Sequence, residues 1–329
     1  MRLKIRFEFH LHIHLYRDNS KTARQDQQMN THGTGSKRFK DIAAETVERL
    51  MPSVSRSTAD NYQTAVRSFL RYAGEGVTLG QVDAQLLKNY EHSLNEQGLR
   101  LNTIGCYMGA LRVLLSKMGR TDLDGCFSEV FTGRVKTDKR SISDEDIIRI
   151  RDLELPGNDF LSLSRDLFMF SIFAMGMPFV DMAFLKHSQF RDGKFEYARH
   201  KTGQRVTVTV EPCMQVIIQR YAREGAVYVF PLLTTVVAPL AYAQYLTKLN
   251  AYNKALKRLA KLAGVEGNLS SYVSRHSWAS LANSLNIGMP VIAQALGHAN
   301  QRHTATYIRQ LDNKHLQDAN RKIIEKLTR

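Results

Sequence analysis

The sequence has few cysteines, and they are not grouped. Only three of its 329 residues are cysteine, and no two of them form a CxxC pair. Disulfide-stabilised secreted domains and zinc-binding domains need several cysteines at short spacings. Both classes are therefore disfavoured, and we expect reduced core thiols of a cytoplasmic protein at Cys106, Cys126 and Cys213.

Long apolar runs are also absent. A helix that spans a bilayer takes about 20 mostly apolar residues, and the chain contains no such stretch. Hydrophobic residues still make up 43% of the sequence, which is ordinary for a globular protein and too high for a disordered one. The chain has no Walker A loop, no GxGxxG fingerprint and no carboxylate cluster suited to Mg²⁺. We therefore expect a globular protein without a membrane span, whose site uses no metal ion or other cofactor.

Acidic residues are also few compared with basic ones. Lys and Arg number 46 against 31 Asp and Glu, which leaves a net charge of +15. Solubility alone is usually met by a smaller charge of either sign. Contacts with phosphates release condensed counterions and reward such an excess. Nucleic acid is the favoured partner, and an anionic membrane surface is the weaker alternative.

The composition changes along the chain and divides it into three parts. Residues 1–37 alternate polar and apolar residues, then become polar and basic. We expect them to be a flexible basic extension, unless translation starts at Met29. His10, His12 and His14 would share one face of a strand, but without a completing Cys or carboxylate an incidental strand is favoured over a metal site. Residues 38–135 are expected to form a helical DNA-clasping domain, and residues 136–329 a second domain.

Helical periodicity dominates the first domain. A capping-box-like Ser57-x-x-Asp60 predicts a helix that ends at Gly74, and a second helix is expected from Asn102 to Gly119. Their apolar stripes indicate a small bundle core. Their basic faces are candidates for contacts with DNA phosphates: Arg67, Arg71 and Arg112.

The second domain mixes helices with a small antiparallel sheet. Residues 120–140 lose periodicity and are interpreted as an interdomain linker. Ser143 and Ser164 are predicted to cap the next two helices. Turns at residues 192–193 and 201–203 flank the segments KFEYARH and RVTVTVE, which predicts hairpins. Helices follow at 241–263, at 275–285 and from Pro290, so the fold class is mainly α with a mixed α+β second domain.

Three segments near the end belong together. SYVSRHSWASLA holds Arg275 and His276, residues 296–298 read LGH, and Tyr307 follows His298 by nine residues. Each alone is weak, because a lone helical tyrosine is more often a packing residue. Their order and spacing make the combination specific. His276 is interpreted as structural support, and Trp278 as packing.

With these motifs the chain resembles the tyrosine recombinase (phage integrase) family, most closely the integrases of Bacteroides-type mobile elements. The family's HxxRH motif aligns with residues 272–276, its LGH box with residues 296–298, and its nucleophile with Tyr307. The family's catalytic lysine lies in a β-hairpin turn, which matches Lys201. The first half resembles the SAM-like core-binding domain of these enzymes.

The resemblance implies a site-specific recombinase that cuts and rejoins DNA through a 3′-phosphotyrosine, without ATP or metal. A phenol has a pKa of about 10, so Tyr307 needs nearby cations or a base. The Arg275 guanidinium suits the non-bridging phosphate oxygens. Lys201 is the candidate general acid for the leaving 5′-hydroxyl, and His298 can bind the phosphate or take the phenolic proton.

Two positions depart from the family pattern. Tyr272 stands where the first histidine of HxxRH is expected, and Met175 stands where the family's first arginine is expected. The loss of one transition-state cation reduces a rate by about 10²–10³-fold. Another basic residue such as Arg165 compensates, or the enzyme is slow, or the chain is a catalytically weakened DNA-binding relative. We favour activity, because the other assigned residues are intact.

Some alternatives remain open at this level. A type IB topoisomerase-like enzyme shares the tyrosine chemistry, although the helical first domain and the amphipathic tail after Tyr307 favour recombination. That tail would dock on a neighbouring subunit or pack within its own. Four basic residues form either a solvated helix face or a DNA-contacting one: Lys254, Lys257, Arg258 and Lys261.

The resemblance also implies partners and a location. We expect double-stranded DNA recombination sites, a homotetramer on DNA, and accessory DNA-bending or excision factors as partners, with no membrane. A bacterial cytoplasmic, nucleoid-associated protein is expected.

Overall fold

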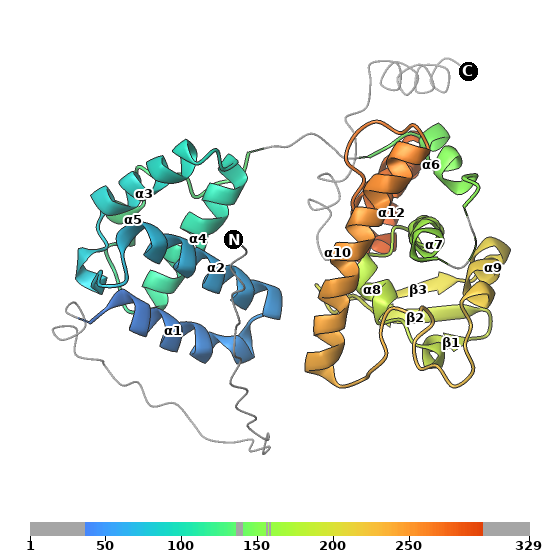
Figure 1. Ribbon diagram of the computed structural model, residues 1–329, viewed down its shortest axis with the longest axis horizontal. Helices are drawn as coiled ribbons and strands as arrows, with labels where there is room; N and C mark the ends of the chain where they lie inside the picture. The colour runs from blue at the N-terminus through green and yellow to red at the C-terminus, as the bar shows by residue number, and fades with distance from the viewer. Residues whose placement is uncertain (1–36, 136–140, 156, 158, 299–329) are drawn as a thin grey trace, which may run out of the picture. The chain divides into compact units, whose positions relative to one another are not determined.

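The computed structural model describes residues 37–135, 141–155, 157 and 159–298. The chain forms two compact units, divided between Lys136 and Thr137. Figure 1 shows the elements of each unit. The predicted basic extension, the predicted tail helix and Tyr307 lie outside the described residues.

The first unit is wholly helical in its described part, as its periodicity predicts. Phe69 lies at its centre, with its ring edge-on to those of Phe39 and Tyr90 at centroid distances of 5.1 and 5.3 Å. All three rings are almost completely buried, so the helices are held by a shared apolar core. The helices are α1 (Phe39–Leu50), α2 (Arg56–Ala73), α3 (Ala84–Glu96), α4 (Leu101–Lys117) and α5 (Leu123–Cys126), with short 3₁₀ turns at Met51–Ser53 and Leu79–Gln81.

Two helix starts differ from their predictions. The cap of α2 is Ser55 rather than Ser57, because the Ser55 hydroxyl accepts the Thr58 N–H at 3.2 Å. Helix α4 begins at Leu101, and the Asn102 side chain instead bonds the backbone of Val135 in both directions, at 2.8 and 2.9 Å. The end of α2 at Gly74 is confirmed, since this residue adopts a φ of 86°.

The linker predicted over residues 120–140 is wrong for most of its length. Leu123–Cys126 form α5, and Cys126, Phe127 and Val130 are buried in the first core. Arg120 fastens this segment by donating to the carbonyls of Leu79 and Val82 at 2.8 and 2.9 Å. The expectation of three core cysteines holds for Cys126 only, because the other two are exposed.

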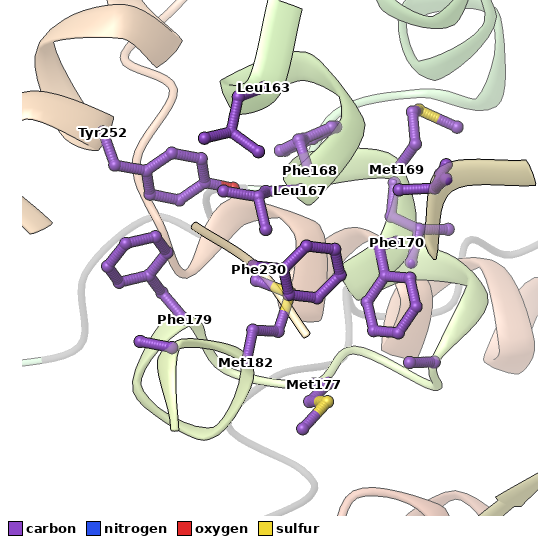
Figure 2. Packing of buried hydrophobic residues seen from close by; sticks show 14 of the residues in the cluster. Leu163, Leu167, Phe168, Met169, Phe170, Met177, Phe179, Met182, Phe230 and Tyr252 are labelled. Carbon is purple, nitrogen blue, oxygen red and sulfur yellow. The ribbon is translucent and has the colours of Figure 1, made fainter. Parts of the chain in front are cut away.

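The second unit is built around α7 (Phe160–Phe173), which packs against α9, α10 and α11. Nearly every side chain of α7 is buried, and Figure 2 shows how Leu167, Phe168 and Phe170 project from it into the core. The other elements are α6 (Asp144–Arg151), α8 (Phe179–Ala183), the 3₁₀ turn His187–Gln189, β1 (Phe190–Arg191), β2 (Lys194–Ala198), β3 (Arg205–Thr209), α9 (Pro212–Arg220), α10 (Ala238–Leu262), α11 (Val273–Ser284) and α12 (Met289–Ala295). The mainly α class with a small sheet is confirmed.

The helix caps of this unit are predicted in part. The Ser143 hydroxyl caps α6 by accepting the Asp146 N–H at 3.1 Å, as expected. Ser164 does not cap α7. It is buried inside the helix and donates to the Phe160 carbonyl, while the Asp159 carboxylate accepts the Ser162 N–H as the cap. Although α7 is apolar, no helix in the described ranges has both the length and the apolarity needed to cross a membrane.

The three strands form one antiparallel sheet in the order β1-β2-β3. Residue pairs Phe195–Val208 and Tyr197–Val206 point into the core, whereas the alternating residues between them are exposed. The β2–β3 turn closes with the Gly203 N–H donating to the Arg199 carbonyl at 2.8 Å. This turn carries Lys201 and lies against Gly297, whose carbonyl accepts the Thr202 hydroxyl at 3.4 Å.

Gly105 and Gly109 on α4 give a matched test of the first core. A Cβ at Gly105 would lie 2.5 Å from the Gly133 carbonyl oxygen and 3.0 Å from the Phe131 ring, whereas one at Gly109 would meet nothing within 4 Å. We expect Gly105→Ala to lower the free energy of unfolding by about 1–3 kcal/mol. Gly109→Ala should raise it by about 0.5–1 kcal/mol. Chemical denaturation of the full chain measures both, and equal effects would contradict this packing.

Candidate active site

The Arg275 side chain joins two of the motif segments. It is the third residue of α11, and it is only 1% exposed. Its Nη1 donates to the Gly176 carbonyl at 2.9 Å, and its Nη2 donates to the Leu296 carbonyl at 2.5 Å. The same Nη2 lies 3.1 Å from Nε2 of His298. The arginine and the histidine predicted from the sequence therefore form one cluster.

The LGH box is the end of α12. The Gly297 N–H donates to Gln294 and the His298 N–H to Ala293, both at 2.9 Å, in the Schellman pattern that terminates helices. Gly297 has a φ of 61°, which favours glycine, and a Cβ there would lie 2.9 Å from the Val206 side chain. The glycine thus allows the tight turn that aims His298 at Arg275.

The loop after α7 provides the other wall of the cluster. The Ser171 hydroxyl donates to the Met177 carbonyl at 2.7 Å and lies 2.7 Å from the hydroxyl of Ser274, the residue before Arg275. Met175 has a φ of 56°, and its side chain is partly buried against the hydrophobic core. The place expected for the family's first arginine therefore carries an apolar, core-packed side chain next to the carbonyl that binds Arg275.

Arg199, directly after β2, belongs to the same cluster although the sequence motifs do not include it. It is 4% exposed, its Nε donates to the Asp181 carboxylate at 3.0 Å, and its Nη1 donates to the Leu296 carbonyl. The other oxygen of Asp181 accepts the His200 N–H at 2.9 Å. A signal existed in the RHK order, because alternation along β2 points Arg199 to the same face as Phe195 and Tyr197.

Lys201 lies in the exposed hairpin turn, directly after these two anchored residues. The neighbouring Thr202 hydroxyl donates to the Gly297 carbonyl at 3.4 Å, so the turn lies against the LGH box. Tyr272 precedes α11 and is 43% exposed, with its ring centroid 6.4 Å from that of His276. Trp278 packs against two hydrophobic clusters, in agreement with its interpretation as a packing residue.

Arg165 does not compensate for Met175. Its Nε pairs with Asp166 at 3.0 Å, and its Nη1 donates to the Leu153 carbonyl at 2.7 Å, so both groups hold the start of α7. The suggestion that this arginine fills the gap in the cluster is wrong.

The candidate DNA-contacting residues fall on both units. Lys254, Lys257, Arg258 and Lys261 are exposed along α10, opposite buried residues such as Leu256 and Leu259. Arg67 and Arg71 are exposed on α2. Arg112 differs, because it forms an ion pair with Asp124 at 2.6 Å. The negative charge of Asp124 weakens the attraction of this arginine for a phosphate.

Tyr197 is a buried tyrosine two residues before Arg199. Its environment makes its phenol a poor nucleophile. Burial and the nearby Asp181 charge raise the pKa of its phenol well above the usual value. Its hydroxyl is therefore held neutral. Tyr197 is therefore not a candidate for the nucleophile.

The sequence matches two family models, one in each unit. The Phage integrase SAM-like domain matches residues 38–121, and the Phage integrase family matches residues 181–314. The chain belongs to the phage integrase family. As a phage integrase family member it is a site-specific recombinase of the tyrosine type, and the second match includes Arg199, Lys201, Arg275, His298 and Tyr307.

Solved structures support the fold of this integrase. A lambda integrase dimer bound to a COC′ core site is similar with a TM-score of 0.65 at 13% identity, over 86% of this chain and 81% of that one. A lambda integrase tetramer bound to a Holliday junction gives 0.64 at 13% identity, over 84% and 80%. The Tn1549 transposon integrase in complex with transposon right end DNA gives 0.63 at 13% identity, over 89% and 100%. No curated protein matches the chain.

Gly176 tests how closely the cluster is packed. A Cβ there would lie 3.0 Å from Cα of Arg275 and 3.1 Å from its Cγ, and the φ of 72° adds strain. Gly193 has a similar φ of 70° but open space around it. We expect Gly176→Ala to reduce DNA cleavage at least tenfold, because it displaces the arginine. Gly193→Ala should keep its cleavage rate and lose only some thermal stability, because alanine is strained at this positive φ. Cleavage rates and thermal unfolding of both variants are the measurement, and a normal cleavage rate for Gly176→Ala would refute the arrangement.

Proposed function

We propose that this integrase cuts and rejoins DNA with Tyr307 as nucleophile and Arg275 as the central phosphate ligand. The observation that carries the proposal is the Arg275 guanidinium, held by the Gly176 and Leu296 carbonyls with its Nη2 beside His298. A guanidinium fixed by packing and two carbonyls is preorganised, so it needs little rearrangement when negative charge develops on the phosphate.

The proposed reaction is a transesterification. The phenolic oxygen of Tyr307 forms a bond to phosphorus, and the bond from phosphorus to the 5′-oxygen breaks. His298 accepts the phenolic proton or binds a non-bridging oxygen, and Lys201 gives a proton to the departing 5′-oxygen. The result is a 3′-phosphotyrosine and a free 5′-hydroxyl. Attack by a 5′-hydroxyl from another strand reverses these steps, so no ATP is required.

The position of Lys201 supports its role. The backbones on either side of it are fastened, by His200 to Asp181 and by Thr202 to the Gly297 carbonyl. The turn is thereby held near the cluster while the exposed lysine side chain keeps its freedom to reach a leaving group. Tyr272, exposed at the start of α11, can donate a hydrogen bond to the phosphate but cannot serve as a base at neutral pH.

A second candidate function is DNA binding with weakened catalysis. It is favoured by one observation, the apolar and core-packed Met175 at the place of an expected arginine. In this reading the fold and the DNA contacts persist while the rate of strand cleavage is reduced. The two functions differ in whether a covalent intermediate accumulates on DNA.

We propose double-stranded DNA recombination sites as the substrate and a homotetramer on DNA as the acting form. The solved relatives include an integrase dimer on a core site and a tetramer on a Holliday junction. The exposed basic residues of α2 and α10 supply phosphate contacts in this proposal. The proposal also includes membership of the Bacteroides-type mobile-element subgroup, accessory DNA-bending or excision factors as partners, and a nucleoid-associated location.

A nicked suicide substrate tests the nucleophile. The nick lets the short 5′-hydroxyl strand diffuse away, so the protein stays attached to DNA. We expect wild type to give a covalent adduct that resists denaturation, with Tyr307 as the modified residue. Tyr307→Phe should bind the same DNA equally and form no adduct. If wild type also binds without forming an adduct, the weakened DNA-binding relative is correct.

The leaving group tests Lys201. Replacing the bridging 5′-oxygen by sulfur gives a thiolate leaving group with a pKa of about 8.5, which departs without protonation. We expect Lys201→Ala to lose at least 100-fold in cleavage of the normal substrate and to approach wild type on the sulfur substrate. Thr202→Ala, beside it in the same turn, is the control and should show no such selective recovery. An equal defect of Lys201→Ala on both substrates would exclude the general-acid role.

A further inference from the structure

A second guanidinium reaches the same carbonyl oxygen as Arg275. Nη1 of Arg199 and Nη2 of Arg275 both donate to the Leu296 carbonyl. Two nitrogen atoms that bond one oxygen lie within about 6 Å of each other, since each bond spans about 3 Å. The two arginines come from different elements, β2–β3 and α11, so their convergence is a property of the tertiary structure.

Arg199 is oriented rather than merely buried. Its Nε is fixed at 3.0 Å from Asp181, whose side chain is 1% exposed, and its Nη1 is fixed by Leu296. Its remaining nitrogen, Nη2, has no hydrogen-bond partner in the part of the chain that the structure describes. A guanidinium that is held by two of its groups and has a third unused can bind an oxyanion at that third group.

The charges of the cluster favour an anionic ligand. Two guanidiniums brought this close repel each other strongly in a buried environment, and Asp181 offsets part of that repulsion. The His200 side chain lies 3.5 Å from the same carboxylate and is half exposed, and its ring is tilted by 36° against that of Phe184 at a centroid distance of 4.8 Å. A phosphodiester between the two arginines would offset the remaining repulsion.

We propose that Arg199 supplies the second guanidinium of the phosphate site, in place of the arginine that Met175 does not provide. Nη2 of Arg199 would bond a non-bridging oxygen of the scissile phosphate while Arg275 binds the other. The proposal rests on the proposed recombinase function and names a further catalytic residue within it. The competing role is structural, in which Arg199 only fixes Leu296 and the turn that carries His298.

A neutral phosphate distinguishes the two roles. Replacing one non-bridging oxygen by a methyl group gives a methylphosphonate, which needs one cation fewer. We expect Arg199→Met to reduce adduct formation on the normal nicked substrate by about 10²–10³-fold. One methylphosphonate isomer lacks the oxygen that Arg199 would contact. On that isomer the difference in adduct formation between Arg199→Met and wild type should be at least tenfold smaller. A gap of the same size on the normal substrate and on both isomers would show a structural role and overturn the proposal.

A second test uses unmodified DNA and places a new arginine at position 175 while Arg199 is replaced. Arg199→Lys keeps the positive charge next to Asp181, so it serves if Arg199→Met does not fold. We expect Met175→Arg to raise cleavage at least tenfold in the Arg199→Lys background and less than threefold in the wild-type background. No gain in the Arg199→Lys background would contradict the proposal.

The outcomes separate this proposal from the proposed function. If wild type forms no adduct at Tyr307 on the nicked substrate, the recombinase mechanism fails and the role of Arg199 fails with it. If wild type forms the adduct while the Arg199 variants show neither selective recovery, only the role of Arg199 is refuted.

Discussion

The hydrogen bonds from the Arg275 guanidinium to the Gly176 and Leu296 carbonyls hold the candidate site together. One carbonyl lies within the loop between α7 and α8 and the other lies at the end of α12, so a single side chain fixes segments that lie 120 residues apart in sequence. A buried charge is costly unless it is hydrogen-bonded. The surrounding backbone therefore has to present its carbonyls to Arg275, and several features of the unit follow from that requirement.

Two glycines allow the backbone to present these carbonyls to Arg275. Gly176 and Gly297 both have positive φ, and a Cβ on either would press on an arginine of the cluster, Arg275 or Arg199. Ser171 and Ser274 complete the arrangement by bonding the loop to α11 inside the core. Backbone carbonyls thus hold both guanidiniums of the cluster, those of Arg275 and Arg199.

The sequence predicts the fold class and much of the site because those features are local. Strict alternation predicts β2 and β3, and the helix that begins near Pro290 carries Gly297 and His298 together at its end. Short apolar patterns are harder. Leu123, Cys126, Phe127 and Val130 follow an i, i+3, i+4, i+7 spacing, yet the polar residues between them led to the interpretation of a linker. Several nearby serines can cap a helix, and which of them does so depends on packing.

Alternation along β2 places Arg199 on the core face, but local patterns do not show what it contacts there. Its role depends on the distance between β2 and the end of α12, which only the folded chain sets. The same limit applies to Arg165, which is close in sequence to the loop after α7 but is bound to Leu153 and Asp166. The nucleophile itself rests on sequence and family, since Tyr307 lies outside the described residues.

The pairing of β2 with β3 restricts how this enzyme can change. Phe195 and Tyr197 face the core, so a shift of the strands by one residue would bury Glu196 and expose both rings. A one-residue insertion within β2 or β3 would impose this shift, so it is a costly way to move Lys201. An insertion in the turn between Arg199 and Gln204 would instead move Lys201 and leave the paired strands in register.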